Sequence, residues 1–118
     1  MAEAAKITPS GPPNVLLIIA DDLGVDASQC YSVGSDLPPM PNLSHLCKRG
    51  VVFDNMWSAP VCSPTRATIL TGRYGFRTGV GSAVTGRGTN AIKLNEWTLP
   101  KALSKETANT YAHALIGK

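Results

Sequence analysis

The sequence lacks any long hydrophobic run. Its longest stretch of consecutive apolar residues, Val15 to Ala20, is six residues long, whereas a membrane-spanning helix needs about 20. The segment from Met1 to Pro13 contains glycine and proline and has no apolar centre, so it does not have the pattern of a signal peptide. We therefore expect no membrane span, and the compartment of the protein stays open.

Cysteine and clustered basic charge are also scarce. The chain has three cysteines, Cys30, Cys47 and Cys62, and no Cys-x-x-Cys pair, which argues against a zinc ribbon. An odd count in a short chain is not typical of a disulfide framework, although a bond between Cys30 and Cys47 stays open. The net charge is +3 and no run of lysine and arginine reaches five residues. Nucleic acid is therefore not a predicted partner, and the small excess fits a local preference for anions.

What is present is an alternation of strand-like and helix-like segments in a chain of 118 residues, long enough for one domain. Residues 1–13 are expected to be a flexible tail, and 24–40 and 74–95 to be mostly loop. We expect strands at 14–22, 51–59 and 110–118. We expect helices at 41–50, from just after Cys62 to residue 73, and from residue 99 onward.

Each of these expectations depends on local chemistry. The run Val15 to Ala20 is typical of a strand buried on both faces. Pro41 suits a first helical turn and Gly50 a helix end, while Thr98 suits an N-cap with Pro100 in the first turn. The order of segments predicts the α/β class, with a mainly parallel sheet flanked by helices.

Chemically distinctive residues fall where the strands are expected to end. Asp21-Asp22, Cys62 and Lys118 would all lie at one rim of a parallel sheet, where ligands collect. The paired carboxylates offer hard oxygen ligands to calcium or magnesium, or else form a solvated turn or a helix cap. Lys118 would steady an anion or be a solvated terminus.

Cys62 has two interpretations of its own. At a helix N-terminus, with Arg66 one turn later, it would lie in a positive field that favours an oxyanion and a reactive sulfur. A free cysteine can equally be a small buried hydrophobe. A phosphatase-type phosphate loop would need a longer spacing than the four residues that separate Arg66 from Cys62.

The stretch Cys62-Ser63-Pro64-Thr65-Arg66, followed after four residues by Thr71-Gly72, resembles the first signature of the sulfatase family. The likeness is to arylsulfatases of the alkaline phosphatase superfamily and covers residues 12–118. Three further blocks carry it, namely PNVLLIIADDLG, PNLSHLCKRGVVFDNMWSAPVCSPTR and YAHALIGK. On this likeness, residues 14–118 resemble the N-terminal part of a sulfatase catalytic domain.

The resemblance implies a specific chemistry. Cys62 would be oxidised to formylglycine by the formylglycine-generating enzyme, and the aldehyde hydrate would attack the sulfur of a sulfate ester. The sulfate would be held covalently until the second hydroxyl of the hydrate expels it. Asp21, Asp22 and residue 62 would bind a calcium ion, Arg66 would orient the hydrate and Lys118 would bind a sulfate oxygen.

The sequence departs from the family pattern near its C-terminal end. His113 replaces a threonine or serine of the second signature, and the glycine expected before Tyr111 is absent. The family's remaining ligands would follow Lys118, so we expect an incomplete site and little turnover from the isolated chain. Two alternatives stay open: a phosphonate or phosphate monoester hydrolase of the same superfamily, and a truncated, non-catalytic fragment.

Overall fold

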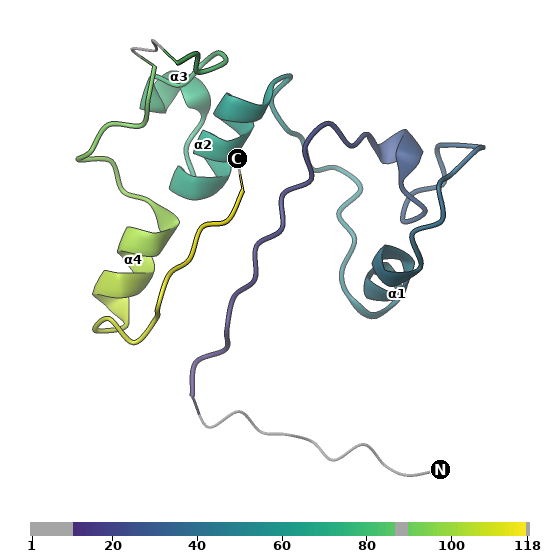
Figure 1. The fold of residues 1–118 in the computed structure, drawn as a ribbon, viewed down its shortest axis with the longest axis horizontal. Helices are drawn as coiled ribbons and strands as arrows, with labels where there is room; N and C mark the ends of the chain where they lie inside the picture. The colour runs from purple at the N-terminus through teal and green to yellow at the C-terminus, as the bar shows by residue number, and fades with distance from the viewer. Residues whose placement is uncertain (1–10, 87–89, 118) are drawn as a thin grey trace.

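The computed structural model describes residues 11–86 and 90–117, and within them the chain forms helices joined by extended segments (Figure 1). The expected tail at 1–13 lies mostly outside the described residues. A short 3-10 helix, η1 (Val25–Ala27), comes first. The α-helices of the described residues are α1 (Pro41–Arg49), α2 (Cys62–Thr71), α3 (Gly75–Thr78) and α4 (Leu99–Glu106).

The helices expected from local signals are confirmed. Helix α1 begins at Pro41 and ends before Gly50, whose backbone N–H donates to the carbonyl of Leu46 at 2.8 Å. Helix α4 has Thr98 at its N-cap and Pro100 in its first turn. Thr98 makes no side-chain capping hydrogen bond, so its extended backbone alone directs the chain into the helix. The proline, glycine and threonine residues at these helix ends were therefore enough to place α1 and the start of α4.

Helix α3 was not expected, because it lies in a segment predicted to be loop. It has four residues and ends at Gly79, whose φ of 83° is left-handed and suits glycine. The Thr78 hydroxyl donates to the carbonyl of Gly75 at 3.0 Å and is buried with that turn. A helix of a single turn is too short to show a hydrophobic period, which is why the sequence did not reveal it.

The strands expected at 14–22, 51–59 and 110–118 are not found in the described parts of these segments. Over the described residues these segments are extended and run in the same general direction, toward the end where α2 begins, but no ladder joins them (Figure 1). Tyr111 donates its hydroxyl to the carbonyl of Pro13 at 2.7 Å, so a side chain and not the backbone connects the first and last segments. A ladder needs neighbours about 4.8 Å apart. The parallel sheet is therefore not confirmed.

The hydrophobic core of the described residues is small and centres on α2. Its buried apolar side chains are Pro64, Ala67 and Val80, where α2 packs against α3, and α4 packs on α2 as well. The radius of gyration is 17.7 Å, against about 13.5 Å for a compact domain of this length. Large apolar side chains of the extended segments, such as Leu16 and Ile116, remain exposed. In the described part of the chain, no helix has the length and apolar character to cross a membrane.

Cys30 and Cys47 form a disulfide, which settles the pairing that the sequence left open. Their Cα atoms are 5.8 Å apart, and the bond ties the loop after η1 to the last turn of α1. Cys62 is the free cysteine among the described residues. The disulfide therefore leaves available the one thiol that the motif singles out.

Candidate functional site

One cleft of about 680 Å³ collects four of the residues predicted to act together. Its walls come from the end of the first extended segment (19–24), the end of the second (58–61) and the first turns of α2. Asp21, Asp22, Cys62 and Arg66 all line it. Of the residues expected to meet at a sheet rim, Asp21, Asp22 and Cys62 therefore lie together, because two extended segments end where α2 begins.

Cys62 is the first residue of α2 and is half-buried. The residue before it, Val61, has an extended backbone and makes no side-chain cap, so the first N–H groups of the helix lack a side-chain acceptor at that position. A helix N-terminus carries a partial positive charge of about half an elementary charge. An anion that entered the cleft beside residue 62 would be stabilised by that charge.

Two hydroxyl groups hold the start of α2 in place, and the motif alone does not reveal these contacts. The Thr65 hydroxyl lies 3.2 Å from the carbonyl oxygen of Ala59 and 3.0 Å from that of Val61, and it donates to both. The Ser63 hydroxyl accepts the backbone N–H of Val84 at 3.0 Å. These bonds fix the helix start against the second segment and against the loop after α3, and so fix the position of Cys62.

The Thr-Gly pair that closes the motif ends the helix. Gly72 has a left-handed φ of 66°, and its N–H donates to the carbonyl of Thr68 at 2.8 Å. The Thr71 hydroxyl donates to the carbonyl of Ala67 at 2.6 Å and accepts the N–H of Arg73 at 3.2 Å. The motif from Cys62 to Gly72 therefore spans the whole of α2, from its first residue to its C-cap.

Charged side chains meet on the other wall of the cleft. Nη2 of Arg66 is 3.8 Å from Oδ1 of Asp21. Asp22 has a φ of 59°, a left-handed value that non-glycine residues adopt rarely and aspartate more readily than most. Asp21 and Asp22 both line the cleft. Lys118, the remaining predicted site residue, lies outside the described residues.

A cation site is only partly formed by these groups. Within residues 11–86 and 90–117, no three side chains of His, Cys, Asp or Glu are placed to hold a metal ion by themselves. Asp21 and Asp22 offer the carboxylate oxygens that calcium prefers, but calcium takes six to eight oxygen ligands. The donor chemistry fits calcium, and the number of donors in this cleft is smaller than calcium requires.

Comparison with known proteins decides the family. The family model described as Sulfatase matches residues 13–116, which is most of the chain. The chain belongs to the sulfatase family. The resemblance based on the Cys62 motif is thus confirmed. The family implies an α/β fold class, although residues 11–86 and 90–117 contain no strand that would confirm the sheet.

The relatives include several named sulfatases. The chain is 38% identical to arylsulfatase D of Homo sapiens over 113 residues, which cover 90% of this chain and 18% of the relative. It is 38% identical to steryl-sulfatase of Mus musculus over 126 residues (98% and 19%) and 36% identical to arylsulfatase H of Canis lupus familiaris over 120 residues (95% and 20%). No solved structure matches the chain with comparable significance. The chain thus spans about a fifth of the length of these relatives.

Proposed function

We propose that the cleft around Cys62 is part of a site that hydrolyses sulfate esters. The observation that supports this most is the meeting of Asp21, Asp22, Cys62 and Arg66 in one cleft of a sulfatase-family chain. The relatives are named as an arylsulfatase and a steryl-sulfatase. A sulfate ester is therefore the substrate class we assign to the protein.

Residue 62 is the proposed nucleophile. We propose that Cys62 is converted to formylglycine by the formylglycine-generating enzyme, which would supply a nucleophilic oxygen in place of the thiol. The start of α2 would stabilise the negative charge that builds on the sulfate oxygens, and Thr65 and Ser63 would keep that start fixed. Arg66, one turn further along the helix, would orient the modified residue.

Calcium is the proposed metal ion. Asp21 and Asp22 would hold it, together with residue 62 and with ligands beyond this cleft, and bound calcium would polarise the sulfate oxygens. Asp21 also faces Arg66, so the two carboxylates would divide their charge between a cation and a guanidinium. Lys118 is proposed to contact a sulfate oxygen.

Mass spectrometry tests the modification directly. The chain is produced together with a formylglycine-generating enzyme, digested with trypsin, and the peptide 50–66 is treated with an aldehyde-reactive tag. We expect the tag on residue 62 and none in the Cys62→Ala variant. A peptide that carries only the thiol form, from a host that modifies a known sulfatase in parallel, would contradict the proposal.

Hydrolysis can be tested in a chimera, because the relatives are several times longer than this chain. Residues 13–116 would replace the matched segment of mouse steryl-sulfatase, and hydrolysis of a steryl sulfate would be measured. We expect activity that Cys62→Ala abolishes and that Cys30→Ala and Cys47→Ala leave detectable. A folded, aldehyde-bearing chimera without sulfate ester hydrolysis would overturn the assigned reaction.

A further inference from the structure

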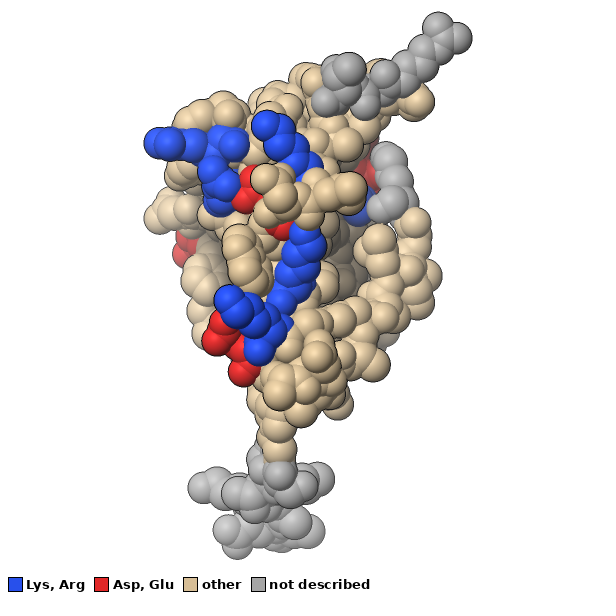
Figure 2. Space-filling model, turned by 90° about the vertical axis from the view of Figure 1, so that its left-hand side faces the viewer, with Lys and Arg blue, Asp and Glu red and all other residues tan. Residues whose placement is uncertain are grey.

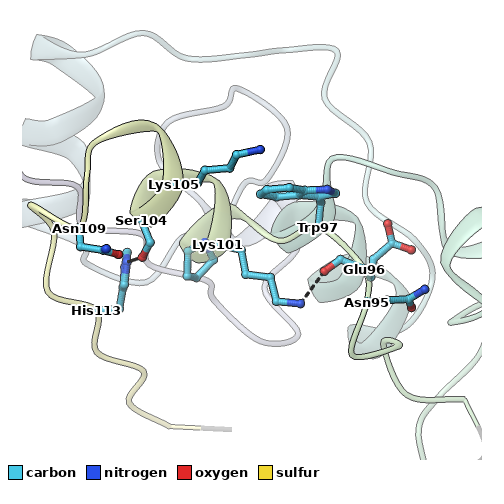
Figure 3. A pocket seen from close by; sticks show the side chains of 9 residues that line it. Asn95, Glu96, Trp97, Lys101, Ser104, Lys105, Asn109 and His113 are labelled. Carbon is cyan, nitrogen blue, oxygen red and sulfur yellow. Dashed lines mark hydrogen bonds between the residues drawn. The ribbon is translucent and has the colours of Figure 1, made fainter.

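A second cleft, of about 610 Å³, lies along α4 and shares no lining residue with the first (Figure 3). Its lining combines an aromatic ring, two lysines and several polar side chains. It is formed by Asn95, Glu96, Trp97, Pro100, Lys101, Ser104, Lys105, Asn109 and His113. Because none of these residues takes part in the proposed hydrolysis, the cleft needs an explanation of its own.

The two lysines hold positive charge at fixed places in this cleft. Nζ of Lys105 lies 4.9 Å from the centre of the Trp97 ring, a cation–π contact. Nζ of Lys101 donates to the backbone carbonyls of Glu96, at 2.8 Å, and Leu94. A lysine that is already positioned loses less side-chain entropy when it meets an anion. The lysines are therefore prepared to bind a negatively charged group.

The acidic side chain of the cleft does not cancel this charge. The carboxylate of Glu96 is paired with the guanidinium of Arg73, which lies just beyond the end of α2. Figure 2 views the side of the molecule that carries α3 and α4, and it shows lysine and arginine side chains spread over this side with acidic side chains among them. The local field thus favours an anionic ligand.

The rest of the lining favours a ligand with hydroxyl groups. Trp97 is half-exposed and, with Pro100, offers apolar surface. At the opposite end, the Ser104 hydroxyl and Nε2 of His113 are hydrogen-bonded at 2.8 Å, with Asn109 beside them (Figure 3). The hydroxyl, amide and imidazole groups of the lining can form hydrogen bonds with several hydroxyls of one ligand. An unsubstituted aryl ring carries no hydroxyl and would leave these groups without a partner on the ligand. A sugar ring packs its C–H face on an indole and presents hydroxyls around its edge.

We propose that this cleft binds an acidic saccharide. The sugar ring would lie against the part of the Trp97 ring that the Lys105 ammonium does not cover. Its sulfate or carboxylate would meet the ammonium groups of Lys101 and Lys105, and its hydroxyls would reach Ser104 and Asn109. Pockets of this kind gain affinity from the apolar wall and orientation from a few polar groups. The inference does not rest on the proposed hydrolysis, because it uses no residue of the first cleft.

The fluorescence of Trp97 tests the proposal in the full 118-residue chain. A Trp57→Phe background leaves Trp97 as the single tryptophan. Glucose 6-sulfate is titrated, with glucose and sodium sulfate in parallel. We expect a saturable change with glucose 6-sulfate, and at least about tenfold weaker binding of glucose and of sulfate, because each lacks one half of the recognised chemistry.

Matched variants separate specific binding from general charge. Lys105→Gln should weaken glucose 6-sulfate binding about tenfold or more, and Lys105→Arg should restore it. Lys48→Gln removes an exposed lysine from the last turn of α1, as Lys105 lies in the last turn of α4, and should change nothing. Far-UV circular dichroism confirms that each variant keeps its helices, and Cys62→Ala should bind as the parent does.

Several results would overturn the proposal. Equal responses to glucose and glucose 6-sulfate would show that the cleft does not recognise the anionic group. Equal responses to sodium sulfate and glucose 6-sulfate would show that it does not recognise the sugar. Tighter binding of 4-nitrophenyl sulfate than of glucose 6-sulfate would assign the cleft to aryl anions instead. Unchanged binding in Lys105→Gln, or equal loss in Lys48→Gln, would show that the cleft is not the site.

Discussion

Arg66 and Asp21 face each other across the first cleft, with Nη2 of the guanidinium 3.8 Å from Oδ1 of the carboxylate. The contact links the second turn of α2 to the end of the first extended segment. Both side chains are partly exposed, at 25% and 41%. An ion pair with this exposure contributes at most about 1 kcal/mol to stability. Its importance is therefore expected to lie in placing charge in the cleft.

This relationship predicts a loss of activity with little loss of stability. Arg66→Gln should change the free energy of unfolding, measured in urea, by no more than about 1 kcal/mol. In the steryl-sulfatase chimera it should lower hydrolysis about 100-fold, as removal of a charge-stabilising donor does. Arg77→Gln, at an exposed position of α3, serves as the matched control and should keep activity. A large fall in stability together with full activity would contradict the proposed role of Arg66.

The disulfide predicts a definite pattern of thiol labelling. Without reductant, intact-mass analysis after alkylation should find one reactive thiol, Cys62, and after reduction it should find three. Cys62→Ala should lower each count by one. Because the bond closes a loop with a sequence separation of 17, its reduction should cost about 3 kcal/mol in the chain-entropy model. Three labelled thiols before reduction would show that the pairing does not form.

The turn at Asp22 separates the effect of charge from that of backbone conformation. Its φ is 59°, a left-handed value that asparagine adopts at a lower cost than alanine. Asp22→Asn should leave the free energy of unfolding nearly unchanged, while Asp22→Ala should lower it by about 1 kcal/mol. Both should weaken calcium binding in the chimera at least about tenfold, measured by calorimetry, because calcium affinity follows the number of charged ligands. Asp36→Asn is the control, since Asp36 is exposed and does not line the cleft.

The sequence was sufficient for features that depend on near neighbours in the chain. Pro41 and Gly50 marked the two ends of α1, Thr98 with Pro100 marked the start of α4, and the Cys62 motif marked α2. The meeting of Asp21, Asp22, Cys62 and Arg66 was also anticipated, because it needs only that extended segments end near the start of α2.

Features that depend on distant partners were not predictable in the same way. The apolar pattern at 14–22 predicts a segment that can pair as a strand. It does not predict which other segment will lie beside it at the strand spacing of about 4.8 Å. Here Tyr111 reaches Pro13 through its side chain, and no ladder joins the segments that the structure describes. The second cleft was missed for a related reason, since Trp97, Lys105 and His113 come together only when the chain after α4 turns back on the helix.

The contact between α2 and α3 predicts one glycine that cannot be replaced. A Cβ atom at Gly75 would overlap the carbonyl of Val80 and lie 3.2 Å from Cβ of Pro64, so the buried turn would have to move. Gly75→Ala should therefore destabilise the α2–α3 unit by about 1–3 kcal/mol, the usual cost of overpacking. Gly81→Ala is the matched control, because a Cβ there meets nothing within 4 Å. Urea unfolding monitored by circular dichroism gives both values. Equal stability of the two variants would show that α3 does not pack on α2 as described.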